Sequence, residues 1–132
     1  MEPRIIKIKK IIGQGTLAVI DKQNNLPFEI KRLFYVYDIP INTRRGGHAH
    51  KILKQFIWTI SGSLEIKTIS KSGRVDNFIL DSPDKGLYIP EMIWADQIIH
   101  IKNTIYCVAA SDYFDESEYI RNRDEFEKLT ED

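Results

Sequence analysis

Two histidines separated by one residue lie in a short basic segment, residues 44–51, which reads Arg-Arg-Gly-Gly-His-Ala-His-Lys. Side chains two residues apart on a β-strand project from the same face, so we expect His48 and His50 to point into one space. The glycines upstream allow the backbone to turn and a ligand to approach closely. Imidazoles titrate near neutral pH, and Arg45 and Lys51 place positive charge beside them. These residue types are suited either to a metal site or to acid–base catalysis.

A metal site is favoured by the histidine pair alone, because neutral imidazoles commonly bind zinc, iron, copper and nickel. The pair resembles the start of the metal-binding cupin pattern, which continues with a Glu, six residues, a Gly and a later His. In this chain Gly62 is preceded at that spacing by Gln55, and Trp94 stands where the later His is expected. Two imidazoles and an amide would give a divalent ion no charged ligand, and catalytic zinc sites ordinarily keep three protein ligands. We therefore expect no metal, and a general acid–base role for His48 and His50.

Aromatic and basic side chains alternate along residues 30–37, which predicts a strand with one face toward the interior. A tyrosine such as Tyr35 would either fill core volume or, from an interior face, hydrogen-bond a sugar hydroxyl or a developing oxyanion. His100 stands alone in an apolar run, where a structural role is favoured. One face of residues 30–37 carries Leu33, Tyr35 and Tyr37, and the other carries Arg32, Phe34 and Val36.

Short apolar segments with a period of two residues recur between turn signals, and this pattern predicts an all-β sandwich or barrel. The brief turns favour antiparallel connections. Residues 55–69 read as a central hairpin, and the last twenty residues predict a helix that packs on the outside of the barrel. The other expected strands are 4–12, 18–21, 28–37, 77–80, 86–89, 97–101 and 104–110, besides the strand that carries the histidines.

The composition is that of a globular protein, with 42% hydrophobic and 29% charged residues, and the length favours a single domain over residues 1–132. Nineteen basic and nineteen acidic residues cancel, which argues against nucleic-acid binding. A single cysteine, Cys107, rules out an internal disulfide. No apolar run is long enough for a signal peptide or a membrane span, so we expect a cytoplasmic protein without a membrane partner.

Taken together, several stretches resemble the cupin-fold TDP-4-oxo-6-deoxyglucose 3,4-ketoisomerases. They are residues 45–51 with Gln55, the turn at 61–63, and the segments 25–37, 82–94 and 110–126. The resemblance implies a cupin or jelly-roll β-barrel with a short C-terminal helix, a homodimer, and no cofactor. It also implies an isomerase that moves the carbonyl of a thymidine-diphosphate-linked 4-oxo-6-deoxy sugar from C4 to C3. Such a reaction belongs to the biosynthesis of deoxy or amino sugars for O-antigen, lipopolysaccharide or S-layer glycans.

By position, we assign His48 as the base at carbon and His50 as its proton-shuttling partner. The reverse assignment stays open, so the two are treated as one coupled unit. Arg45 and Tyr35 would stabilise the enediolate. The remaining residues that the resemblance implies in substrate binding are Arg32, Lys51, Gln55 and Trp94.

One loop departs from the family pattern: residues 13–17 read Gly-Gln-Gly-Thr-Leu, and Gln14 stands where relatives carry an arginine. This substitution puts the nucleotide preference in question. Two alternatives stay open, a related sugar-nucleotide epimerase in which the carbonyl remains at C4, and a non-catalytic sugar-nucleotide-binding cupin. The apolar N-terminal strand would suit pairing with a second copy. The sequence does not set the configuration at C4 of the product.

Overall fold

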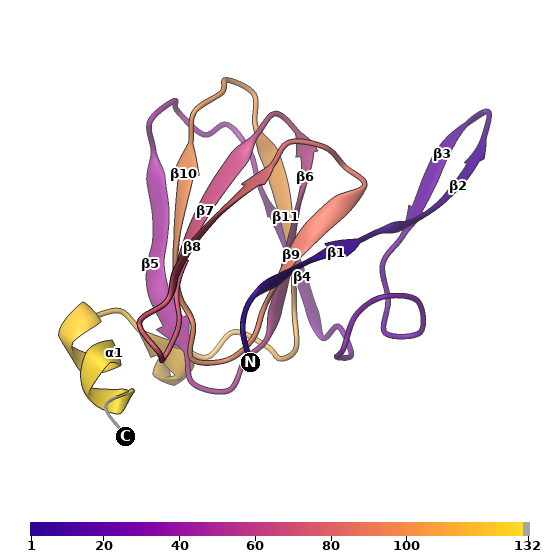
Figure 1. The fold of residues 1–132 in the computed structure, drawn as a ribbon. Helices are drawn as coiled ribbons and strands as arrows, with labels where there is room; N and C mark the ends of the chain where they lie inside the picture. The colour runs from indigo at the N-terminus through magenta and orange to yellow at the C-terminus, as the bar shows by residue number, and fades with distance from the viewer. Residues whose placement is uncertain (131–132) are drawn as a thin grey trace.

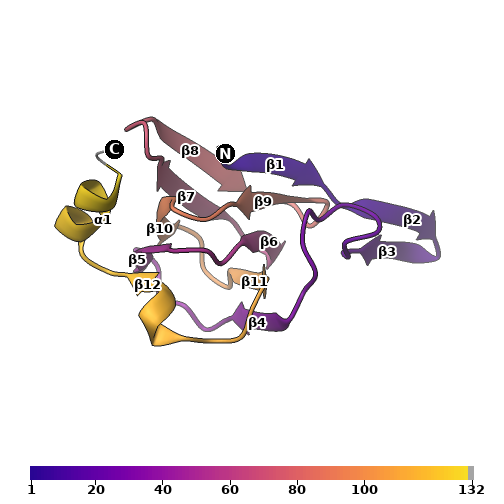
Figure 2. The same ribbon diagram turned by 90° about the horizontal axis from the view of Figure 1, so that it is seen from below.

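Short antiparallel strands build two five-stranded sheets that face each other (Figures 1 and 2); the computed structural model describes residues 1–130. The two sheets do not join into one closed hydrogen-bonded barrel. The all-β class with a short C-terminal helix is thus confirmed, and the architecture is an open jelly-roll sandwich. In order, the first sheet holds β1 (Arg4–Lys7), β9 (Lys85–Ile89), β6 (Gln55–Ser61), β11 (Ile105–Ala110) and β4 (Arg32–Val36). The second holds β12 (Tyr119–Ile120), β5 (Arg44–His50), β10 (Trp94–Ile99), β7 (Leu64–Ile69) and β8 (Val75–Leu80).

The main core lies between the two sheets and is built from alternate side chains of both. Ile57 of β6 and Leu87 of β9 meet Ile66 of β7 and Ile99 of β10, and all four are fully buried. The period of two residues sends these apolar side chains inward, where their removal from water stabilises the fold.

A second apolar cluster covers the outer face of the first sheet. Phe56, Trp58 and Tyr88 pack there beneath the segment between β3 and β4, which contributes Leu26 and Phe28. Both faces of β6 are therefore buried, and β9 and β11 pair with its two edges. The expectation that 55–61 is a central strand is confirmed. The expected hairpin over 55–69 is wrong, because after the turn at Gly62 the chain crosses to the second sheet, where β7 pairs with β8 and β10 instead of β6.

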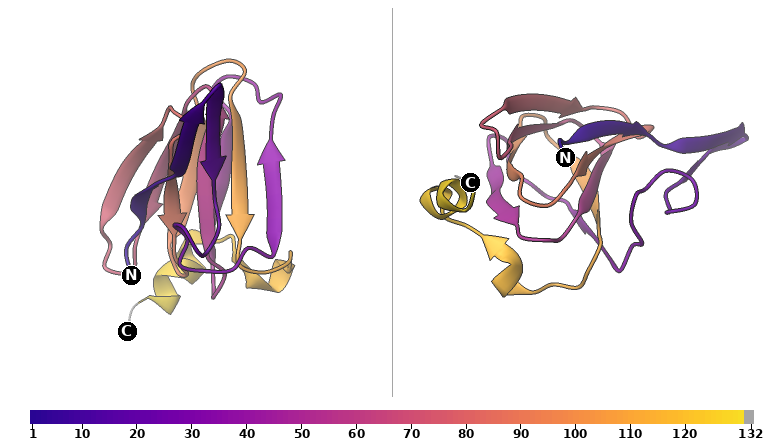
Figure 3. Two further views of the ribbon diagram at one scale, coloured as in Figure 1. Left: turned by 90° about the vertical axis from the view of Figure 1, so that its right-hand side faces the viewer. Right: turned by 60° about the horizontal axis from the view of Figure 1, so that its bottom comes forward.

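An N-terminal hairpin, β2 (Lys9–Gly13) and β3 (Gly15–Val19), stands apart from the sandwich (Figures 1 and 3). Its strands pair with each other and belong to neither large sheet. The expected strand 4–12 is thus wrong in one respect: it is divided at Ile8, whose side chain is buried in the second cluster. The strand expected at 18–21 begins earlier, directly after the turn at Gly15, whose φ of +98° favours glycine.

The C-terminal segment differs most from expectation, because the twenty-residue helix is replaced by three short elements. A 3-10 turn (Glu116–Glu118) leads into β12, and only Arg123–Leu129 forms the helix α1. The Asn122 side chain accepts a hydrogen bond from the Glu125 amide at 3.1 Å, so the helix begins after this N-cap. Phe126 of α1 packs on Trp94. The helix lies outside the second sheet, as expected (Figure 1). Within residues 1–130, no helix has the length and apolar character needed to span a membrane.

Candidate active site

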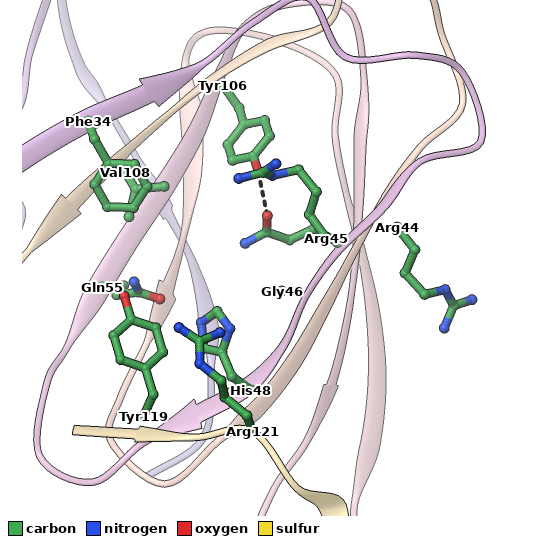
Figure 4. Close-up of a pocket in the computed structure, with 11 residues that line it drawn as sticks. Phe34, Arg44, Arg45, Gly46, His48, Gln55, Tyr106, Val108, Tyr119 and Arg121 are labelled. Atoms are coloured by element: carbon green, nitrogen blue, oxygen red, sulfur yellow. Dashed lines mark hydrogen bonds between the residues drawn. The ribbon is translucent and has the colours of Figure 1, made fainter. Parts of the chain in front are cut away.

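A cavity of about 390 Å³ lies between β11 and β4 of the first sheet and the β5–β12 edge of the second (Figure 4). Its walls are polar and basic, in contrast to the apolar core between the other strands. The side chains that line it come from six strands and the residue after β12; they are Phe34, Arg44, Arg45, His48, Gln55, Gln97, Tyr106, Val108, Tyr119 and Arg121.

A bulge in β5 determines which residues of the basic segment enter the cavity. Gly46 has a φ of +80°, and a Cβ atom there would lie 2.9 Å from the Ala95 carbonyl oxygen. Pairing of β5 with β10 shifts register at this point. Arg45 and His48 are three residues apart and would face opposite sides of a regular strand, yet the bulge brings both to the cavity. The expected turn of the backbone at the glycines is confirmed.

His48 and His50 project from the same side of β5, and their ring centroids are 4.9 Å apart at 79°. His48 lines the cavity, whereas His50 lies deeper, with only 5% of its surface exposed. Neither ring nitrogen of His50 has a hydrogen-bond partner among the described residues. The pair thus forms one imidazole cluster with an accessible and a buried member.

Burial favours the neutral form of both imidazoles. Desolvation lowers the pKa of His48 below its ordinary value. Desolvation, followed by the positive charge of a protonated His48, Arg32 and Arg121, lowers the pKa of His50 to about 3. A neutral imidazole has one nitrogen free to accept a proton, so His48 is available as a base at the cavity wall.

The short strand β12 supplies two cavity residues that the sequence analysis missed. Tyr119 pairs directly with His50 across the two strands, and its ring centroid lies 4.4 Å from that of His50 and 4.9 Å from that of His48. The guanidinium of Arg121 lies 4.3 Å from the centroid of the Tyr119 ring. Both residues fall where a helix was expected, and the acidic pattern around them gave no sign of a strand.

Polar side chains also line the inner end of the cavity. Tyr106 donates a hydrogen bond from its hydroxyl to Gln97 Oε1 at 2.6 Å, and burial raises the pKa of this phenol. Arg45 lies beside Tyr106, while Gln55 faces Tyr119 from the start of β6 (Figure 4). The alternation of apolar side chains along residues 104–110 could have predicted this, because Tyr106 and Val108 are two residues apart and therefore face the interior from the same side of the strand.

Five of the eight predicted site residues lie in or against the cavity. His48, Arg45 and Gln55 line it, and His50 adjoins His48. Arg32 is half-buried beside the pair, with its guanidinium 5.1 Å from the Phe34 ring centroid. Its Nε and Nη2 atoms are buried without a hydrogen-bond partner in the described chain.

The other three predicted residues point away from the cavity, and their placement there was wrong. Tyr35 is 64% exposed and stacks on Tyr37, because Arg32, Phe34 and Val36 form the inward face of β4. Lys51 is exposed beyond the end of β5, and its backbone amide donates to the Glu118 carbonyl at 3.1 Å. Trp94 is buried at 5% exposure but packs outward against α1.

Because Trp94 points outward, its side chain does not occupy the place of the metal-binding His of a cupin. Ala95, the next residue, pairs with His48 and belongs to the core between the sheets. Neither residue is a metal ligand. Within residues 1–130, no group of three or more His, Cys, Asp and Glu side chains is arranged to hold a metal ion.

The similarity to known proteins extends over nearly the whole chain and is not confined to the cavity. A family profile described as FdtA, WxcM-like, C-terminal, matches residues 1–131. The curated TDP-4-oxo-6-deoxy-alpha-D-glucose-3,4-oxoisomerase of Aneurinibacillus thermoaerophilus is 38% identical over 129 residues, which cover 97% of this chain and 92% of the relative.

Two solved structures are similar over nearly their full length. A 3,4-ketoisomerase from Helicobacter canadensis superimposes with a TM-score of 0.92 at 34% identity, covering 100% of this chain and 99% of that one. The sugar 3,4-ketoisomerase QdtA from Thermoanaerobacterium thermosaccharolyticum, in complex with TDP, has a TM-score of 0.91 at 32% identity, covering 98% of this chain and 94% of that one.

Proposed function

The chain belongs to the FdtA family of sugar 3,4-ketoisomerases and is an isomerase, and from this premise we propose its substrate and mechanism. It converts TDP-4-oxo-6-deoxyglucose into a TDP-3-oxo-6-deoxyhexose by histidine-mediated proton transfer through an enediolate. The observation that carries this proposal is the contact between two neutral imidazoles at the wall of a polar, cationic cavity. The 3,4-oxoisomerase relative and the TDP complex of QdtA support the choice of substrate.

The reaction begins at C3, whose proton is acidified by the neighbouring C4 ketone. His48 takes this proton, because it is the member of the pair that lines the cavity. The C4 oxygen acquires negative charge as the enediolate forms, and the Arg45 and Arg121 guanidinium groups stabilise that charge.

The second half of the reaction returns a proton to carbon at C4. The C3 hydroxyl gives up its proton and becomes the new carbonyl, while the C4 oxygen takes up a proton and becomes a hydroxyl. C3 is oxidised and C4 is reduced by the same electron pair, so the net reaction needs no redox cofactor. His50, buried against His48, is the partner that shares protons with it, and the pair acts as one coupled unit.

Basic and amide side chains suit a sugar nucleotide as ligand. Gln55 faces the cavity and would orient the sugar through its amide. Arg32 has buried donors without partners among the described residues, and these suit an anionic diphosphate or an enediolate oxygen. We further propose a homodimer and a single domain over 1–132. A cytoplasmic location and a role in making deoxy or amino sugars for surface glycans stay predictions.

The test is incubation of the purified protein with TDP-4-oxo-6-deoxyglucose without added metal, followed by NMR of the product. A carbonyl at C3 is expected. A carbonyl kept at C4 beside an inverted centre would replace the proposal with an epimerase. Binding without any conversion would replace it with a non-catalytic sugar-nucleotide-binding protein.

A further inference from the structure

We infer that Tyr119, Arg121 and Glu116 form a positioning unit that holds the His48–His50 pair in its working arrangement and balances the charge beside it. The inference deepens the proposed function and rests on it for the effect on turnover. Its structural basis is the segment from the 3-10 turn through β12, which pairs with β5 on the edge opposite β10. Figure 4 shows Tyr119 and Arg121 beside His48.

Tyr119 is the part of the unit that contacts both imidazoles. His50 makes no hydrogen bond through either ring nitrogen within the described chain, so no polar partner fixes its rotamer. The Tyr119 ring crosses the His50 ring at 62° and the His48 ring at 63°, with centroids 4.4 and 4.9 Å away. Packing against this ring therefore orients the imidazoles and excludes water from His50.

Arg121 and Glu116 hold Tyr119 in place. The Arg121 Nε and Nη2 atoms donate to the two Glu116 carboxylate oxygens at 2.7 and 3.0 Å, a bidentate ion pair. This ion pair keeps the guanidinium over the Tyr119 ring. Glu118 links the same segment to the loop that follows β5, because its Oε1 atom accepts hydrogen bonds from the Ile52 and Leu53 amides.

The unit also places one positive and one negative charge near His48. After burial, which has the largest effect, Arg121 lowers the pKa of His48 and Glu116 raises it. The other charged groups that face the histidine pair are Asp96 on β10, Arg32 on β4 and Arg45 on β5. Removing either member of the ion pair leaves the charge of the other unbalanced. The pKa of His48 should therefore shift in opposite directions when Glu116 or Arg121 is replaced.

The first experiment compares Tyr119→Ala with Tyr119→Phe. Histidine titrations are followed by NMR without substrate, and turnover is measured with TDP-4-oxo-6-deoxyglucose. Removing the ring should raise the pKa of His50 by about one unit or more, because water then reaches it. It should also lower kcat by about 10²-fold with a smaller change in KM. Tyr119→Phe keeps the ring and should recover most of both properties. An unchanged His50 titration together with unchanged kcat in Tyr119→Ala would overturn the inference.

The second experiment uses exposed residues, whose replacement leaves the core intact. Glu116→Gln should lower the pKa of His48 and Arg121→Gln should raise it, each by a few tenths of a pH unit at low salt. Glu127→Gln is the control. It breaks a similar ion pair, in which Arg123 Nη2 lies 3.0 Å from Glu127 Oε1 away from the cavity, and it should leave the pKa of His48 unchanged. Shifts of the same sign, or none, would contradict the charge balance.

These outcomes separate the inference from the proposed function, because the titrations require no substrate. If the two variants shift the pKa of His48 in opposite directions but the protein does not convert TDP-4-oxo-6-deoxyglucose, the positioning unit is supported and the ketoisomerase function is rejected. Normal turnover without the shifts would retain the ketoisomerase and reject the unit.

Discussion

His48 and His50 lie on the same side of β5 but at different depths, and this difference has consequences for stability as well as catalysis. His50 has a pKa of about 3 in the folded protein against an ordinary value of 6.5. Between these two values the unfolded chain binds a proton that the folded protein does not. The free energy of unfolding therefore falls as pH decreases from 6.5 toward 3, by up to about 1.4 kcal/mol per pH unit.

Removing the buried imidazole should weaken this pH dependence. In His50→Asn, urea unfolding followed between pH 7 and pH 5 should give a shallower fall in the free energy of unfolding than in the unmodified protein. His48 also has a lowered pKa, so part of the dependence should remain. Equal slopes in the two proteins would mean that His50 is protonated in the folded state.

At the scale of elements, the C-terminal segment depends on the Asn122 cap that separates β12 from α1. Asn122→Ala removes the acceptor for the Glu125 amide and should lower the free energy of unfolding by about 1 kcal/mol. Asn122→Asp keeps an acceptor oxygen and is the matched control. Urea unfolding measures both. A loss in Asn122→Asp as large as that in Asn122→Ala would show that the hydrogen bond to the Glu125 amide does not stabilise the segment.

Strand periodicity was sufficient to predict the elements that carry His48 and Gln55, because alternation is a local property of the chain. It could not decide which face of β4 points inward, since both faces combine aromatic and apolar side chains, and Tyr35 was assigned to the wrong one. Tyr119 was missed for a different reason. A strand of two residues has almost no pattern of its own, and β12 exists through its pairing with β5.

At the scale of the whole molecule, the β2–β3 hairpin belongs to neither sheet and exposes apolar residues, and Ile12 is 75% exposed. An ion pair joins it to the sandwich, since Lys10 Nζ lies 3.2 Å from Asp84 Oδ2 in the turn before β9. A lone hairpin is marginally stable in water, which supports the proposal that a second copy covers it. Gln14 lies in the turn of this hairpin and does not line the chain's own cavity. Any effect of Gln14 on nucleotide binding therefore requires the hairpin to reach another copy.

The proposed homodimer predicts a change of mass on hairpin substitution. Ile12→Lys combined with Leu17→Lys should convert a dimer to a monomer in size-exclusion chromatography with light scattering, because the charges disfavour burial of the hairpin. Ile101→Lys, in an exposed loop away from the hairpin, is the control and should remain dimeric. A monomeric unmodified protein at micromolar concentration would refute the dimer.

The most direct test of the central claim is the fate of TDP-4-oxo-6-deoxyglucose in deuterated water, compared between the unmodified protein and His48→Asn by NMR. Proton transfer by the histidine pair predicts a product with its carbonyl at C3 and solvent deuterium at C4. The asparagine variant should bind TDP but lose conversion by about 10²-fold or more. A product that keeps its carbonyl at C4, or an unchanged rate in His48→Asn, would contradict a histidine-mediated 3,4-ketoisomerase.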